Sequence, residues 1–190
     1  MTEGHFDPKR APFLDAEERI KELRPYQLLK DTAGVKTGMT CVDLGCGTGT
    51  FTFPLLLCVG SEGVVYGVDD SEEMLEHIRS KNPPANLILV HADVNRTGLD
   101  NSIADFCLLS SILHEVDQPA NLVAEAFRLL KSGGRVLDLD WKAELDSPGP
   151  PQRRRLSRDK VEQLFKHTGF HNLQYLDWSR NHYAFLGDKK

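Results

Sequence analysis

The sequence predicts a doubly wound α/β fold, in which helices cover both faces of a mostly parallel sheet. Short apolar runs rich in Val, Leu and Ile alternate with helical segments, and the links between them are short. The runs are apolar at almost every position, as is typical of strands buried on both faces of a parallel sheet. With 190 residues, 40% of them hydrophobic and 27% charged, the chain has the size of one globular domain.

We expect about seven strands with helices between them. The strands are predicted over residues 40–44, 64–68, 87–91, 103–109 and 135–139, and residues 170–176 and 182–186 are predicted to form a terminal hairpin. Helices are predicted over residues 50–58, 72–80 and 118–131, with Ser71 and Asp117 as N-caps of the last two. The link over residues 94–102 is too short for a long helix. A Pro- and Gly-rich loop over residues 147–151 precedes a helix that Ser157 caps and Gly169 ends.

A leading helix is expected before the first strand. Asp15 and Glu18 have the spacing of a capping box, and apolar residues follow at helical spacing. Pro25 should interrupt or kink this helix, because proline cannot donate the backbone hydrogen bond. The segment ends at Gly34.

Composition excludes several classes of protein. The chain has no apolar stretch of the roughly 20 residues that a transmembrane helix needs, and its first ten residues lack the apolar core of a secretory signal. We therefore expect a cytoplasmic protein without membrane insertion. The net charge of −5 argues against nucleic acid as a partner. Cys41, Cys46, Cys58 and Cys107 lie in apolar patterns without zinc-finger spacing, so no metal site is expected.

A glycine-rich loop follows the first predicted strand, which is where an open parallel sheet binds its ligands. Residues 43–49 (DLGCGTG) place a glycine at every second position directly before a helix. Such a loop lets the backbone approach a ligand closely, and the helix N–H groups can bind polar atoms. A dinucleotide fingerprint would have its third glycine where this chain has Thr50. The pattern is therefore GxGxG, which disfavours a nicotinamide-dependent reductase.

Carboxylates end the next two strands and predict a nucleoside ligand. Asp69 lies twenty residues past Gly49, the spacing at which a carboxylate binds the vicinal hydroxyls of a ribose. Asp93 ends the following strand, where it could accept a hydrogen bond from an adenine amino group while Val94 packs on the ring. The later strands also end in polar residues, namely Ser110 and Ser111 before His114 and Glu115, and Asp138 and Asp140 before Trp141.

These motifs resemble the class I S-adenosylmethionine-dependent methyltransferases, in the group that contains the ubiquinone and menaquinone C-methyltransferases. The resemblance covers about residues 35–141. It is carried by residues 42–49 (VDLGCGTG), 67–69 (GVD) with 71–75 (SEEML), and 129–134 (LLKSGG). It implies a Rossmann-like methyltransferase fold with strand order 3-2-1-4-5-7-6 and an antiparallel last strand. It also implies one methyltransferase domain over 1–190, with an N-terminal helical cap or gating arm (1–34), a cofactor-binding core (35–141) and a C-terminal helix and β-hairpin (142–190).

The resemblance implies S-adenosyl-L-methionine as cofactor and S-adenosyl-L-homocysteine as product. Asp43 would lie near the amino group of the cofactor, Asp69 would hold the ribose, and Asp93 with Val94 would flank the adenine. Ser71 and Met74 would lie near the adenosine, and the backbone of Ser110 near the methionine moiety. The full set of implied cofactor-binding residues is Asp43, Gly45, Cys46, Gly47, Gly49, Asp69, Asp70, Met74, Asp93, Val94 and Ser110.

The expected activity is methyl transfer to a small molecule by direct in-line displacement, because the cofactor carries its own electrophile. His114, Glu115 and Asp140 are the catalytic candidates if the acceptor must lose a proton. The alternatives are C-methylation of a quinone- or lipid-type acceptor and a protein that binds the nucleoside without turnover. Arsenite methylation is disfavoured, because only Cys46 lies near the predicted cleft.

Two further segments bear on the acceptor. Between the fifth and sixth strands, where many members of the resembling family carry a substrate-covering insertion, this chain has few residues. We therefore expect the segment that covers the site to be residues 5–26, including His5, Phe6, Arg19 and Tyr26. The basic run Arg153, Arg154 and Arg155 with Arg158 is interpreted as solvated loop charge, with an anionic substrate or a membrane-surface contact as the alternative.

Overall fold

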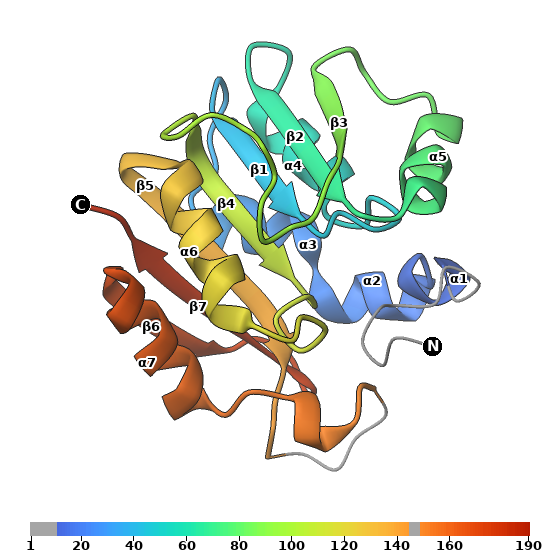
Figure 1. Cartoon of the computed structure of the whole chain (residues 1–190). Coiled ribbons are helices and arrows are strands. Elements are labelled where there is room, and N and C mark those ends of the chain that lie inside the picture. Colours follow the sequence, from blue (N-terminus) through green and yellow to red (C-terminus); the bar gives the residue numbers. More distant parts are fainter. Residues whose placement is uncertain (1–10, 145–148) are drawn as a thin grey trace.

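A computed structural model describes residues 11–144 and 149–190 (Figure 1). Its described strands form one sheet in the order β3-β2-β1-β4-β5-β7-β6. The strands are β1 (Thr40–Leu44), β2 (Val64–Asp69), β3 (Leu87–His91), β4 (Ala104–Ser110), β5 (Leu130–Trp141), β6 (His171–Asp177) and β7 (His182–Asp188). Strands β1 to β5 pair in parallel, and β7 lies antiparallel between β5 and β6. The predicted order and the terminal hairpin are confirmed.

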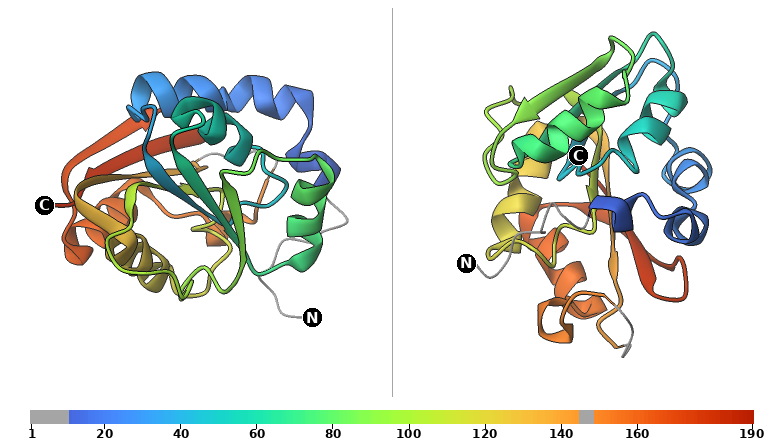
Figure 2. Two further views of the ribbon diagram at one scale, coloured as in Figure 1. Left: turned by 90° about the horizontal axis from the view of Figure 1, so that it is seen from above. Right: turned by 90° about the vertical axis from the view of Figure 1, so that its right-hand side faces the viewer.

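Helices cover both faces of the sheet (Figure 2). They are α1 (Ala11–Leu14), α2 (Glu17–Leu23), α3 (Pro25–Gln27), α4 (Thr52–Val59), α5 (Glu72–Ser80), α6 (Pro119–Leu129) and α7 (Arg158–Thr168), with a π-helical turn (Leu28–Thr32) and a 3₁₀ turn (Gln152–Arg154). One face packs on α6 and α7 through residues such as Leu122 and Phe165. The other packs on the N-terminal helices and α4 through residues such as Leu28 and Leu55. Within the described ranges, no helix combines the length and apolarity needed to span a bilayer.

Two predicted helix starts are wrong. Ala16, not Asp15, is the N-cap of α2, because the Asp15 side chain turns away to accept a hydrogen bond from Thr48. The N-cap of α6 is Gln118 rather than Asp117. Pro119 explains this position, since a proline without N–H is suited to the first helical residue and makes the residue before it the cap.

Other local predictions are confirmed. Arg24 ends α2 in the left-handed conformation and Pro25 begins α3, so proline interrupts the leading helix. The Ser71 hydroxyl caps α5 by accepting from the N–H of Met74, and Gly169 ends α7. Strand β5 begins earlier than predicted, because Leu130 pairs with β4 before a bulge.

The parallel register brings the carboxyl ends of β1 to β5 to one edge of the sheet. The chain runs outward from β1 through β2 to β3, and then returns to place β4 on the other side of β1. The direction of winding therefore reverses between β1 and β4. Ligands of open α/β sheets bind in the crevice at such a point.

Candidate active site

A cavity of about 1000 Å³ lies at this carboxyl edge. Such a volume is at the upper end of the roughly 300–1,000 Å³ of pockets that hold small molecules. Its wall comprises the glycine loop, the ends of β2, β4 and β5, residues that follow β3, and residues of α1 and α2. Of the predicted site residues, Asp43, Gly45, Cys46, Gly47, Asp69, Asp70, Met74, Asp93, Val94, Ser110, His114 and Glu115 line it. Gly49 and Asp140 are not part of the wall.

The glycine loop is shaped by backbone contacts and by tight packing. The N–H groups of Gly45 and Cys46 both donate to the carbonyl of Val68, which ties the loop to the end of β2. Gly49 has a φ of +88°, and a Cβ on it would lie 2.8 Å from the ring of Phe53. Glycine suits this position in the turn toward α4, because a side chain there would be strained and would meet Phe53.

Asp43 is a buried carboxylate with one unsatisfied oxygen. Its Oδ2 accepts from the hydroxyl of Thr52 at 2.7 Å, whereas its Oδ1 is buried without a hydrogen-bond partner among the described residues. Burial raises the pKa of Asp43 to about 7. Buried polar atoms are normally paired, so Oδ1 fits a site for a donor that a ligand supplies. The amino group of the predicted cofactor is such a donor.

Asp69 is held rigidly at the end of β2. Its Oδ2 accepts from the N–H of Gly47 at 2.8 Å, and its Oδ1 accepts from the N–H of Ser71 at 3.0 Å. Burial raises its pKa. Each carboxylate oxygen has a second lone pair, so both can still accept from a pair of hydroxyls. Asp70 beside it is exposed at the rim of the cavity.

The next part of the wall is mostly apolar. Val94 and Met74 are buried and line the cavity. Asp93 is exposed, and its Oδ1 accepts from the backbone and side-chain N–H groups of Asn95. Cys46 also lines the cavity, and burial raises the pKa of its thiol. It is therefore a neutral thiol, and no cluster of metal-binding side chains occurs in the described ranges.

His114, which also lines the cavity, lies between two carboxylates. Its Nδ1 lies 2.6 Å from Asp140 Oδ1, and its Nε2 lies 3.6 Å from Glu115 Oε1. Burial alone would lower the pKa of His114, but the charge of Asp140 and its hydrogen bond raise it to about 10. His114 is therefore an imidazolium near neutral pH. Asp140 also accepts from the N–H of Trp141 at 2.6 Å and acts on the cavity only through His114.

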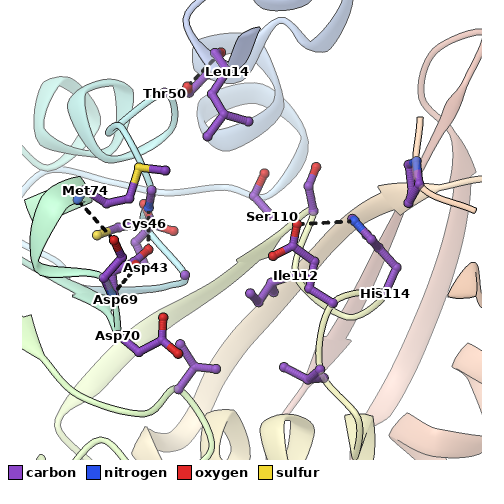
Figure 3. A pocket seen from close by; sticks show the side chains of 18 of the residues that line it. Leu14, Asp43, Cys46, Thr50, Asp69, Asp70, Met74, Ser110, Ile112 and His114 are labelled. Carbon is purple, nitrogen blue, oxygen red and sulfur yellow. Dashed lines mark hydrogen bonds and ion pairs between the residues drawn. The ribbon is translucent and has the colours of Figure 1, made fainter. Parts of the chain in front are cut away.

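The labelled side chains divide the cavity into two ends (Figure 3). Asp43, Cys46, Asp69 and Met74 gather at one end, and His114 lies at the other. The first end has the groups expected to bind a nucleoside with an amino acid. The second has a cationic side chain. The arrangement fits a cofactor and a second molecule in the same cavity.

The N-terminal segment closes part of the cavity, as expected. Phe13, Leu14 and Arg19 line it, whereas Tyr26 does not. His5 and Phe6 lie outside the described residues. Asp15 fastens this segment to the loop and to α5 through Thr48, Lys81 and His77, at 2.6, 2.8 and 3.0 Å. We call these four residues the Asp15 latch.

The loop after β5 contributes residues that the sequence analysis missed. Pro150 and Pro151 line the cavity beside Trp141. The interpretation of the arginine run as solvated charge is wrong for two residues. The buried Arg155 donates to the carbonyl of Pro150 at 3.0 Å, and Arg154 donates to that of Glu115 at 3.0 Å. The Arg154 partner lies 39 positions away in the chain, so no local pattern reveals it, whereas Arg155 binds a carbonyl only five positions before it.

Comparison with known proteins agrees with this site. Residues 42–137 match the family described as a methyltransferase domain. An uncharacterized 37.1 kDa protein in transposon TN4556 of Streptomyces fradiae is 30% identical over 165 residues, which is 84% of this chain and 48% of that protein. A demethylmenaquinone methyltransferase of Staphylococcus aureus is 36% identical over 115 residues, or 60% of this chain and 47% of that enzyme. The chain thus spans about half the length of these curated relatives.

A solved structure agrees over the whole fold. A SAM-dependent methyltransferase from Aquifex aeolicus superposes with a TM-score of 0.90 at 26% identity, covering 98% of this chain and all of that one. The family match begins within β1 and spans the glycine loop, strands β2 to β4 and most of β5. The chain therefore belongs to the class I S-adenosylmethionine-dependent methyltransferases.

Proposed function

We propose that this chain transfers a methyl group from S-adenosylmethionine to a small-molecule acceptor. The observation that carries the proposal is the unsatisfied Asp43 Oδ1 in a cavity with two chemically different ends. The cofactor supplies a methyl group on a positively charged sulfur, which a nucleophile displaces in line. Asp43 holds the amino group of the cofactor, Asp69 holds the ribose, and Val94 packs on the adenine.

At the acceptor end, His114 and Glu115 have different roles. His114 carries a proton on both ring nitrogens and donates to an oxygen of the acceptor. Glu115 lines the cavity, with 22% of its side chain exposed, and is placed to take the proton that a phenol or an acidic carbon loses on methylation. Asp140 is a positioning residue, because it orients His114 without lining the cavity.

Calorimetric titration with S-adenosylmethionine and S-adenosylhomocysteine tests the cofactor assignment, with NADH as the control ligand. We expect binding of both sulfur nucleosides and none of NADH. Asp69→Ala should weaken binding by about 1–3 kcal/mol, because it leaves the ribose hydroxyls unpaired. Asp31→Ala is the matched control, since Asp31 is an exposed acid outside the cavity. Binding of NADH alone, or an unchanged affinity in the Asp69 variant, contradicts the proposal.

C-methylation of a quinol is a second candidate for the reaction. Apolar residues of the cavity wall, including Trp141, Phe13 and Pro150, support a flat apolar acceptor, and a relative named demethylmenaquinone methyltransferase shares 36% of residues over the matched region. Turnover of reduced demethylmenaquinone with release of S-adenosylhomocysteine tests it. Tight nucleoside binding without turnover of any acceptor would instead indicate a non-catalytic binding protein.

The proposal extends to the organisation and location of the protein. Residues 35–141 serve as the cofactor-binding core, while the N-terminal segment and residues 142–190 complete the acceptor end. The four cysteines are buried free thiols, which supports a reducing, cytoplasmic location. Fractionation of cells that express the full-length protein tests this part.

A further inference from the structure

Arg19 on α2 has an unpaired donor at the wall of the cavity. Its Nη1 donates to the carbonyl of Leu14 at 3.1 Å, and its Nη2 donates to Ser111 Oγ at 3.4 Å. Its Nε–H is buried and has no hydrogen-bond partner in the described part of the chain. Burial lowers the pKa of Arg19 to about 10, so the guanidinium is still cationic near neutral pH.

The nearest carboxylates do not pair with this cation. Asp15 and Glu22 attract Arg19 through their charge but do not form an ion pair with it among the described residues. Asp15 binds the other members of the Asp15 latch, and Glu22 Oε1 accepts from Ser179 and Asn181. Over residues 11–144 and 149–190, Arg19 makes no ion pair. A partly buried cation with a free donor has its strongest available partner in an anionic oxygen.

The contact with Ser111 places Arg19 on the side of the cavity where β4 ends. Ser111 directly follows β4, and its N–H donates to the carbonyl of Leu139 on β5 at 2.7 Å. Burial, and to a lesser extent the charge of Arg19, lower the pKa of His182 at the start of β7. The His182 ring lies 4.2 Å from that of Trp141, between centroids. Arg19 therefore lies beside the ends of β4 and β5 through Ser111, and its other partner, the carbonyl of Leu14, also accepts from Thr50 at 3.1 Å.

We propose that the methyl acceptor carries an anionic oxygen group, a carboxylate or a phosphate monoester, which binds Arg19 Nε. The Ser111 hydroxyl is the second donor, since it accepts from Arg19 and keeps its own proton to donate. Phe13, Trp141 and Pro150 contact the apolar body of the acceptor. This inference rests on the proposed function, because it assigns one end of the cavity to the acceptor.

Binding to the protein saturated with S-adenosylhomocysteine tests the inference. The probes are 2-naphthoate, 2-naphthyl phosphate and the neutral 2-naphthamide, titrated by calorimetry. We expect at least one anion to bind about tenfold more tightly than the amide, the effect of one charge-assisted hydrogen bond. A preference for naphthoate identifies a carboxylate acceptor, and a preference for naphthyl phosphate identifies a phosphate acceptor. Equal binding of the three probes, or binding of none, overturns the inference.

Arg19→Gln should abolish the preference for the anion and leave the affinity for S-adenosylhomocysteine unchanged. Lys21→Gln is the matched control, because it removes the same charge from an exposed position on α2 whose ion pair within the described ranges is with Glu17 on the surface. A preference that survives in Arg19→Gln overturns the inference. Loss of S-adenosylhomocysteine affinity in this variant also overturns it, because Arg19 would then bind the carboxylate of the cofactor. Failure of the wild-type protein to bind S-adenosylhomocysteine refutes the proposed function instead.

Discussion

Replacement of Asp140 by Asn should change the charge of His114 and lower the stability of the protein. The structure places Asp140 Oδ1 at 2.6 Å from His114 Nδ1, and the pKa of His114 rises from 6.5 to about 10. At about 1.4 kcal/mol per pKa unit, the folded state prefers the imidazolium by about 5 kcal/mol. Breaking one partner of a buried ion pair typically costs about 3–5 kcal/mol, so we expect a loss in this range.

The loss should depend on pH in a defined direction. Because the folded pKa of His114 is raised, its contribution is complete below the unfolded pKa of 6.5 and disappears as the pH rises through about 10. Urea denaturation should therefore show the full difference between wild type and Asp140→Asn at about pH 6 and only a small one at about pH 10.

Two further measurements check the cause. The ring of His114, assigned with a His114→Gln variant among the seven histidines, should stay protonated past neutral pH in the wild type by NMR. In Asp140→Asn its pKa should fall back toward its ordinary value. Affinity for S-adenosylhomocysteine should not change, because Asp140 does not line the cavity. A wild-type ring that titrates near neutral pH, or a stability difference independent of pH, would refute the reasoning.

Three other substitutions test the packing around the site. Asp15→Asn weakens the latch and should cost about 1 kcal/mol, with faster tryptic cleavage within residues 11–24; an unchanged cleavage rate contradicts this role. Gly49→Ala should lower the free energy of unfolding by about 2–4 kcal/mol, because the methyl group adds a clash at 2.8 Å to an unfavourable φ. Gly38→Ala is its control and should lose only about 1–2 kcal/mol, since φ is +82° but no atom lies within 4 Å. Tyr183→Phe removes the hydrogen bond to Asp138 Oδ2 at 2.8 Å, leaving a buried carboxyl without a partner, and should cost about 1–3 kcal/mol by urea denaturation. A neutral effect would show that water or another donor replaces the hydroxyl.

The strands and most of the cofactor end could be predicted from the sequence, because their signals are local. Apolar runs, Pro25 and the glycines of the loop each determine the backbone structure of only a few neighbouring residues. The position of Asp69 beside the glycine loop could be predicted from its spacing of twenty residues past Gly49. The wrong N-caps at Asp15 and Asp117 show the limit of such signals, since a tertiary contact or a following proline overrides a cap preference.

The acceptor end was decided by the tertiary structure. Asp140 and His114 are 26 positions apart in the chain, and Arg19 and Ser111 are 92 apart. Contacts over such separations depend on how β4, β5 and α2 pack together. The sequence by itself determined that Asp140 ends a strand and that Arg19 precedes the sheet. Only the fold decided that Asp140 keeps His114 charged and that Arg19 faces the cavity. Burial and the distance to a partner set the charge of a side chain, and both depend on how distant segments pack.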